Sequence, residues 1–73
     1  MHRFLIVFEK GEGNWAAYSP DLPGCVSTGQ TPEEAEAHMA EALRFHIKGL
    51  REEGYEVPKG QSYAQVLTIE EAN

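Results

Sequence analysis

A helix with both ends marked lies between Thr31 and Gly54, and it constrains the fold more than any other stretch of the chain. Thr31 is a favourable N-cap, Pro32 occupies the first helical position, and Glu34 completes a capping box. Gly54 can adopt the left-handed backbone conformation that ends a helix. We therefore predict one helix whose start and stop are both encoded locally.

The predicted helix is amphipathic, since a rotation of about 100° per residue collects its apolar side chains on one side. That apolar stripe contains Ala35, Met39, Ala42, Leu43, His46, Ile47 and Leu50. A flanking stripe contains Glu34, His38, Glu41, Phe45 and Glu52. The apolar stripe needs a sheet to cover. Phe45, an aromatic among carboxylates, is expected to pack under a loop or against another subunit.

Strands are expected before the helix. The stretch from Met1 to Glu9 contains an unbroken apolar run, which predicts a strand covered on both faces. Residues 11–14 have the composition of a hairpin turn, and 15–18 should return as an antiparallel strand. The two prolines of residues 19–25 exclude that segment from a regular ladder.

Two further strands complete the predicted domain. The sequence predicts a short third strand at Cys25–Thr28 and a fourth strand, after the helix, at Tyr63–Ile69. The expected fold is α+β, in the order β-β-β-α-β, with one helix packed on one face of a small mixed sheet. Residues 1–73 should form a single domain.

One face of the predicted sheet has no cover. A chain of this length buries only about 60% of the surface it exposes when unfolded, so association is the expected source of extra stability. We expect a homo-oligomer, a dimer or a tetramer, formed through the alternate aromatic and aliphatic side chains of the first two strands. The expected interface residues are Phe4, Ile6, Phe8, Trp15 and Tyr18.

The charge balance limits the possible partners. Twelve acidic residues against six basic ones give a formal charge of −6, which disfavours direct binding to nucleic acid and favours a basic protein partner. Cys25 is the only cysteine, as is compatible with a reducing compartment. The apolar run near the N-terminus is too short for a signal sequence or a membrane span. We expect a cytoplasmic location.

Catalytic interpretations find little support in the residues. A two-metal nuclease needs three or four carboxylates, and the strand and loop positions offer only Glu9 and Asp21. Cys25 with His46 is a conceivable nucleophile and base, but a lone cysteine opening a strand is more typical of a core. His38 has neighbouring glutamates but too few strong ligands for a metal. We expect no cofactor, no metal and no enzymatic activity.

A longer motif resembles that of a known family. The string Tyr-Ser-Pro-Asp-Leu-Pro-Gly-Cys at 18–25, then Gly29-x-Thr31 and Glu-Glu-Ala at 33–35, resembles the HicB-like antitoxin family. The resemblance implies a partial ribonuclease-H-like fold and a role in neutralising a small basic, RNA-cleaving HicA-type toxin. Gln30 departs from the acidic residue that relatives often have. Many members also carry a C-terminal DNA-binding domain. Because the sequence ends at Asn73, we do not expect autoregulation through such a domain.

Three hypotheses follow. The first is a binding module that masks a basic HicA-type toxin. Its candidate contacts are Asp21, Leu22, Glu34, Glu41, Phe45 and Glu52. The second is a stand-alone homo-oligomer with no toxin partner. The third, the least supported by the residues, is a degenerate ribonuclease-H-like nuclease.

Overall fold

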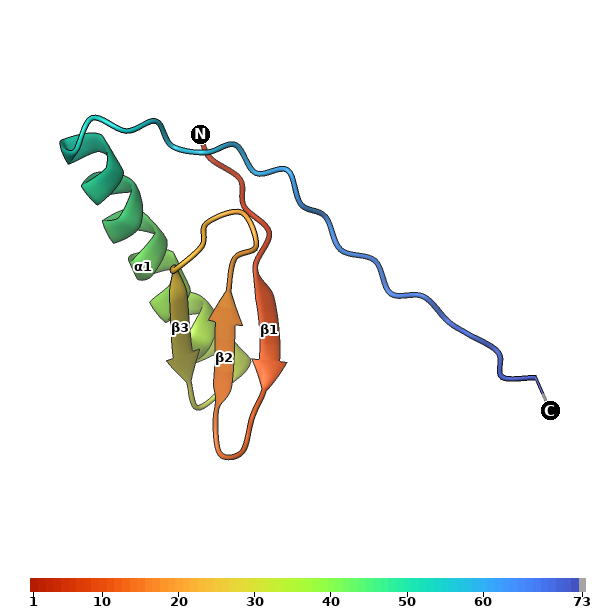
Figure 1. Cartoon of the computed structure of the whole chain (residues 1–73). Helices are drawn as coiled ribbons and strands as arrows, with labels where there is room; N and C mark the ends of the chain where they lie inside the picture. Colours follow the sequence, from red (N-terminus) through yellow and green to blue (C-terminus); the bar gives the residue numbers. More distant parts are fainter. Residues whose placement is uncertain (73) are drawn as a thin grey trace.

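The computed structural model describes residues 1–72 and consists of three strands followed by one helix (Figure 1). The strands are β1 (Val7–Lys10), β2 (Trp15–Tyr18) and β3 (Val26–Gly29), and the helix is α1 (Pro32–Glu52). The α+β fold class and the β-β-β-α order expected from the sequence are confirmed.

The sheet is antiparallel, with strand order β1-β2-β3. Val7 lies opposite Tyr18, which in turn lies opposite Val26, so these side chains form a row on one face. The turn between β1 and β2 is closed by the backbone N–H of Gly11, which donates to the carbonyl oxygen of Asn14 at 2.8 Å. The predicted hairpin is therefore confirmed, although β1 begins at Val7 rather than at the N-terminus.

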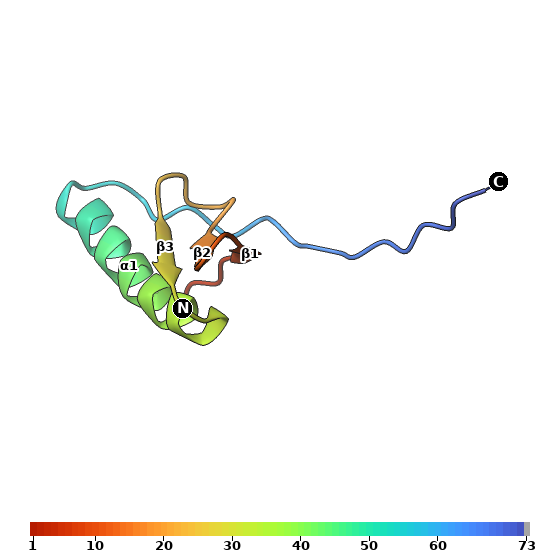
Figure 2. The same ribbon diagram turned by 90° about the horizontal axis from the view of Figure 1, so that it is seen from below.

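The predicted fourth strand is not part of the sheet. Residues 63–69 are extended and exposed, and they belong to no strand in the described structure. After Gly60 the chain moves away from β1 and projects beyond the body of the molecule (Figures 1 and 2). The prediction of a mixed sheet in the order β-β-β-α-β was wrong for this chain, because a β pattern becomes a strand only where a neighbouring backbone pairs with it.

Helix α1 starts and stops where the sequence predicts, although the Glu34 side chain accepts from the backbone N–H of Gln30 and not from that of Thr31, as a capping box requires. The Oγ1 of Thr31 accepts a hydrogen bond from the backbone N–H of Glu34 at 3.0 Å. At the other end Gly54 has a φ of 80°, its N–H donates to Arg51, and the N–H of Tyr55 donates to the carbonyl of Leu50. These two bonds define a Schellman motif, which satisfies carbonyls that the last turn leaves free.

The core lies between α1 and the sheet. The helix packs on β3 and β2, as Figure 2 shows from below. The fully buried side chains of the core are Ala17, Leu22, Cys25, Ala35 and Met39. Gly29 lets the strand approach the first turn of the helix, since a Cβ there would lie 2.5 Å from the backbone nitrogen of Ala35.

Most of the side chains predicted for the bare face of the sheet point toward the core instead. Phe4, Ile6, Phe8 and Trp15 are half-buried and pack against the core cluster. Of the five residues predicted for an oligomer interface, only Tyr18 lies in the row on the opposite face. The alternation was assigned to the wrong side of the sheet, because the pattern gives the period and only the helix position decides which face is inward.

No helix in residues 1–72 is long and apolar enough to cross a membrane.

Candidate partner-binding surface

The C-terminal half of α1 carries a shallow hollow of about 340 Å³. Its lining includes Phe45, Glu52, Glu53 and Tyr55. Phe45 is 79% exposed and Tyr55 64% exposed, so two aromatic rings meet water beside two carboxylates. Aromatic residues are enriched at protein interfaces, where a few side chains with a polar rim around them carry most of the binding energy.

Three of the predicted contacts belong to this part of the helix. Phe45 and Glu52 line the same hollow, and Glu41 is exposed one turn before Phe45 on the same flank. The structure thus groups Glu41, Phe45 and Glu52 as the helix sequence predicts. We call these three residues, with Glu53 and Tyr55, the helix-end surface.

Glu34 has a structural task at the other end of α1. Its Oε1 accepts a hydrogen bond from the backbone N–H of Gln30 at 2.8 Å, which ties the strand-to-helix turn to the first helical turn. His38, on the same flank, donates from Nδ1 to the carbonyl oxygen of Thr28 at 2.6 Å, so its ring is also used within the fold. Glu34 and His38 therefore both form hydrogen bonds within the chain.

Asp21 holds three segments of the chain together. Its Oδ2 accepts the backbone N–H of Leu5, and its Oδ1 accepts those of Gln61 and Ser62, each at 3.0 Å. The bond from Leu5, followed by those from Gln61 and Ser62, lowers the pKa of Asp21 from its ordinary value of 3.8 to about 2. The backbone N–H of Asp21 also donates to the hydroxyl of Ser19, which fixes the loop. Asp21 was predicted as a partner contact, but its carboxylate binds backbone N–H groups of this chain. We call these three hydrogen bonds, from Leu5, Gln61 and Ser62, the clasp.

Leu22 faces inward. Its side chain is 1% exposed, and with Met39 it is the largest fully buried side chain of the described chain. A partner contact through Leu22 is therefore wrong for this structure. The two prolines of the loop fix a corner that turns Leu22 under the sheet, a direction that composition alone did not give.

The side chains considered for catalysis lie in positions that do not favour it. Cys25 is 4% exposed, and burial raises the pKa of its thiol, which disfavours the reactive thiolate. Glu9 is exposed on β1, while the Asp21 carboxylate is occupied by backbone N–H groups. Within residues 1–72, no group of three or more His, Cys, Asp or Glu side chains is arranged to hold a metal ion.

Sequence reasoning missed Tyr55 and Glu53. The signal was present at Gly54, because a Schellman motif turns the chain back and brings the residue after the glycine against the last helical turns. The N–H of Tyr55 donates to the carbonyl of Leu50 at 2.8 Å, and this bond carries the ring to the hollow beside Phe45.

Comparison with known proteins identifies the family. A family model described as the HicB_like antitoxin of bacterial toxin-antitoxin systems matches residues 4–73. The chain belongs to this HicB-like antitoxin family. The Pro-Asp-Leu-Pro-Gly-Cys corner and the Thr31 cap, which carried the resemblance, are the features that here build the clasp and start α1.

Individual relatives agree with this assignment. Antitoxin HicB 2 of Photorhabdus laumondii is 34% identical over 68 residues, which cover 88% of this chain and 49% of that protein. A 14.9 kDa protein from the rep-hol intergenic region of Haemophilus phage HP1 is 38% identical over 64 residues, covering 88% of this chain and 48% of the phage protein. The chain thus spans about half the length of these two relatives.

A shorter relative matches along almost its whole length. A UPF0150 protein of Thermoplasma acidophilum is 31% identical over 68 residues, which cover 92% of this chain and 96% of that protein. No solved structure matches the chain.

Proposed function

We propose that this HicB-like protein neutralises a small, basic, RNA-cleaving toxin of the HicA type by covering part of its surface. The helix-end surface carries the proposal, since it combines two exposed aromatic rings with exposed carboxylates. The formal charge of −6 has the sign that a basic toxin requires. A ribonuclease-H-like fold and a cytoplasmic location belong to the same proposal.

The two chemical components of this surface have different tasks. Carboxylates around the hollow speed the encounter with a basic protein, an effect that falls as salt rises. Phe45 and Tyr55 lose their exposed area on binding and slow dissociation, as buried aromatic anchors do. Mutation of a carboxylate should therefore change the association rate, whereas truncation of an aromatic ring should change the dissociation rate.

The test is binding to a small basic protein encoded beside this chain, together with suppression of that protein's RNA cleavage. Phe45→Ala should weaken the complex by about tenfold or more, the usual size for an aromatic anchor. Glu52→Lys should slow association at low salt. Its control is Glu36→Lys, which makes the same charge change at an exposed helix position on the opposite flank.

Two results would refute the proposal. One is the absence of binding at micromolar concentration and low salt. The other is equal loss of binding in Glu52→Lys and Glu36→Lys with no effect of Phe45→Ala, because net charge rather than this surface would then govern the interaction.

A stand-alone homo-oligomer is the second candidate function. The observation in its favour is the row of Val7, Tyr18 and Val26 on the sheet face away from α1, where Val26 is 64% exposed and Tyr18 36% exposed. Sedimentation showing a stable oligomer, with no toxin-like protein able to bind it, would favour this candidate over the first.

A further inference from the structure

The C-terminal segment Gln61–Ile69 has the character of a strand without a sheet. It carries no charge, proline or glycine, and the nearest charged residues on its two sides are Lys59 and Glu70. Four of its side chains are strongly exposed: Tyr63 by 84%, Val66 by 93%, Leu67 by 71% and Ile69 by 80%. Such apolar, β-favouring stretches with charged neighbours are typical of strands that pair with another backbone.

The same chain has a sheet edge without a partner. β1 is the outer strand of the order β1-β2-β3, so one side of its backbone pairs with β2 while the other lies at the sheet edge. A free edge of this kind is a template for an additional strand.

The start of the C-terminal segment is fixed beside this edge. Asp21 accepts the N–H groups of Gln61 and Ser62 with one oxygen and that of Leu5 with the other. Gly60 lies so close to Arg3 that a Cβ at position 60 would overlap the Arg3 carbonyl. The segment therefore leaves the molecule from a defined point rather than from a loose linker.

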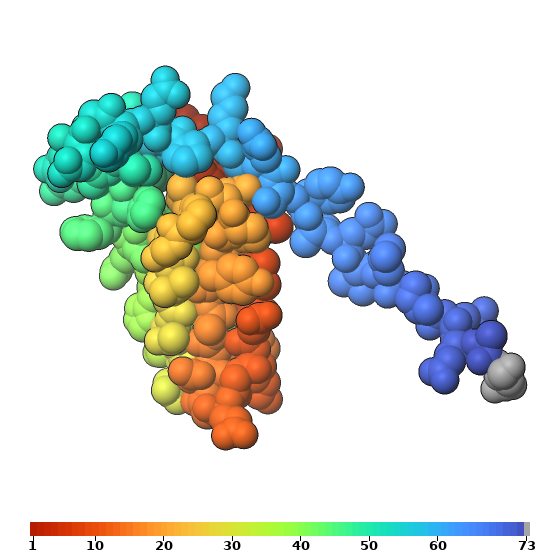
Figure 3. Space-filling model, in the orientation of Figure 1, coloured from red at the N-terminus to blue at the C-terminus, as the bar shows by residue number. Residues whose placement is uncertain are grey.

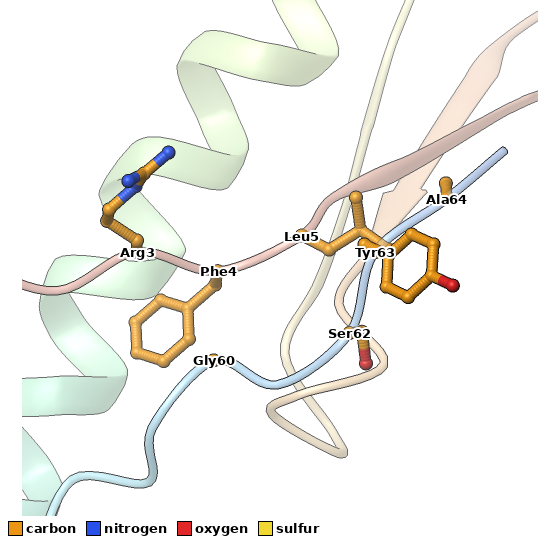
Figure 4. A pocket seen from close by; sticks show the side chains of 7 residues that line it. All are labelled: Arg3, Phe4, Leu5, Gly60, Ser62, Tyr63 and Ala64. Carbon is orange, nitrogen blue, oxygen red and sulfur yellow. The ribbon is translucent and has the colours of Figure 1, made fainter.

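Beyond this point the segment and β1 diverge. A hollow of about 380 Å³ opens between Phe4 and Leu5 on one side and Ser62, Tyr63 and Ala64 on the other (Figure 4). The space-filling view shows the segment standing clear of the sheet (Figure 3). We call its residues Tyr63–Ile69 the arm. The longest dimension of the molecule is consequently 56 Å, against 28 and 18 Å in the other directions. The arm is positioned to reach a neighbouring molecule.

We propose that two copies of this protein exchange these arms, so that Tyr63–Ile69 of each copy pairs with the free edge of β1 in the other. A chain that presents both an unpaired edge and an unpaired strand is self-complementary. A twofold axis satisfies both at once and leaves no open end for further growth. Pairing supplies hydrogen-bond partners for the backbone of the arm and places Tyr63, Leu67 and Ile69 on one face of the partner's sheet and Val66 on the other. The exchange also gives the fourth strand of the sequence pattern a place, in the partner's sheet.

A second copy fits the arm better than a basic protein does. The arm is uncharged over its whole length, so it offers nothing that distinguishes a basic partner. The acidic helix-end surface is a separate feature at the end of α1. The proposed exchange therefore does not depend on toxin binding, and either proposal can fail without the other.

Crosslinking of single-cysteine variants tests the exchange in the full chain. In a Cys25→Ala background, chains with Val66→Cys are mixed with chains carrying Glu9→Cys, refolded together and treated with a short bismaleimide. We expect a covalent heterodimer. The double variant, with both cysteines in one chain, should give a covalent dimer. If the double variant instead forms only an internally linked monomer, the arm pairs with its own β1 and the proposal fails.

Sedimentation equilibrium provides a second measurement. The unmodified chain should be dimeric at about 10 µM, as expected for a dimer dissociation constant of about 1 µM or below. Val66→Pro removes a donor from the centre of the arm and should raise the dimer dissociation constant at least about tenfold. Its control, Glu71→Pro, lies beyond the pairing segment and should leave the constant unchanged.

The proline variant is informative because residues 63–69 are exposed throughout and lie outside the core, so the helix signal in circular dichroism should persist. A monomeric wild-type chain, or a dimer that Val66→Pro leaves intact, would overturn the exchange. A dimer without the Val66–Glu9 crosslink would overturn it as well, since another surface would then join the copies.

Discussion

Replacing Leu22 by alanine separates two roles for the loop between β2 and β3. Leu22 is 1% exposed, and its neighbours in the core include Ala17, Cys25 and Ala35, which are all small. The side chains of Ala17 and Ala35 have no rotatable bond with which to fill a void, so the space left by Leu22 can close only in part. Burial of a leucine side chain is worth about 1.5–3 kcal/mol, and the residual cavity raises the cost of Leu→Ala to about 2–5 kcal/mol.

We expect Leu22→Ala to lower the free energy of unfolding by about 3 kcal/mol, within that range. In a domain of this size each kcal/mol shifts the midpoint by about 4–8 °C, so Tm should fall by about 12–24 °C. Thermal unfolding followed by circular dichroism at a fixed protein concentration measures the change. Val26→Ala is the control, since Val26 is 64% exposed and should change stability by about 0.5 kcal/mol or less.

A different outcome would refute this reasoning. If Leu22→Ala leaves Tm within a few degrees of the wild type but weakens binding to a toxin, Leu22 is the surface contact predicted from the sequence. A fall in Tm with unchanged affinity of the folded protein identifies it as core. Measuring binding well below the Tm of the variant keeps the two effects apart.

Three further perturbations test separate contacts. Gly29→Ala places a Cβ 2.5 Å from the nitrogen of Ala35 and should cost about 1–3 kcal/mol in urea unfolding, and a neutral result would contradict the close strand–helix approach. Thr31→Ala removes the acceptor for the N–H of Glu34 and should cost about 1 kcal/mol, whereas Thr31→Ser should recover most of it. The Asp21 carboxyl has a pKa of about 2 when folded against 3.8 ordinarily, so its contribution to stability is complete above about pH 4 and is lost as pH falls through 2. The wild-type advantage over Asp21→Asn should shrink across that window, and a constant difference between the two would show that the charge of Asp21 does not support the clasp.

Local signals predicted the most local parts of this fold. Thr31, Pro32 and Gly54 marked the helix ends because capping depends on a few adjacent residues. The turn at residues 11–14 formed for the same reason. The Glu41, Phe45 and Glu52 flank was predictable because helical spacing alone places these side chains together.

The sequence pattern did not predict the contacts between residues that are far apart in the chain. Asp21 was predicted as an exposed contact, yet it binds backbone groups of residues 5, 61 and 62, from opposite ends of the chain. Phe8 and Trp15 alternate as expected, but α1 lies on their side of the sheet. A period of two identifies two faces without saying which one a distant helix will cover.

The order of residues was enough to predict where the helix starts and stops, where β1 turns into β2, and to which family the chain belongs. The folded chain was needed to show that Leu22 points inward, that Asp21 joins residues near both termini, and that residues 63–69 stand apart from the sheet. The reason is physical: caps and turns are satisfied by neighbours in sequence, whereas a buried face or a paired strand exists only when a distant backbone arrives to meet it.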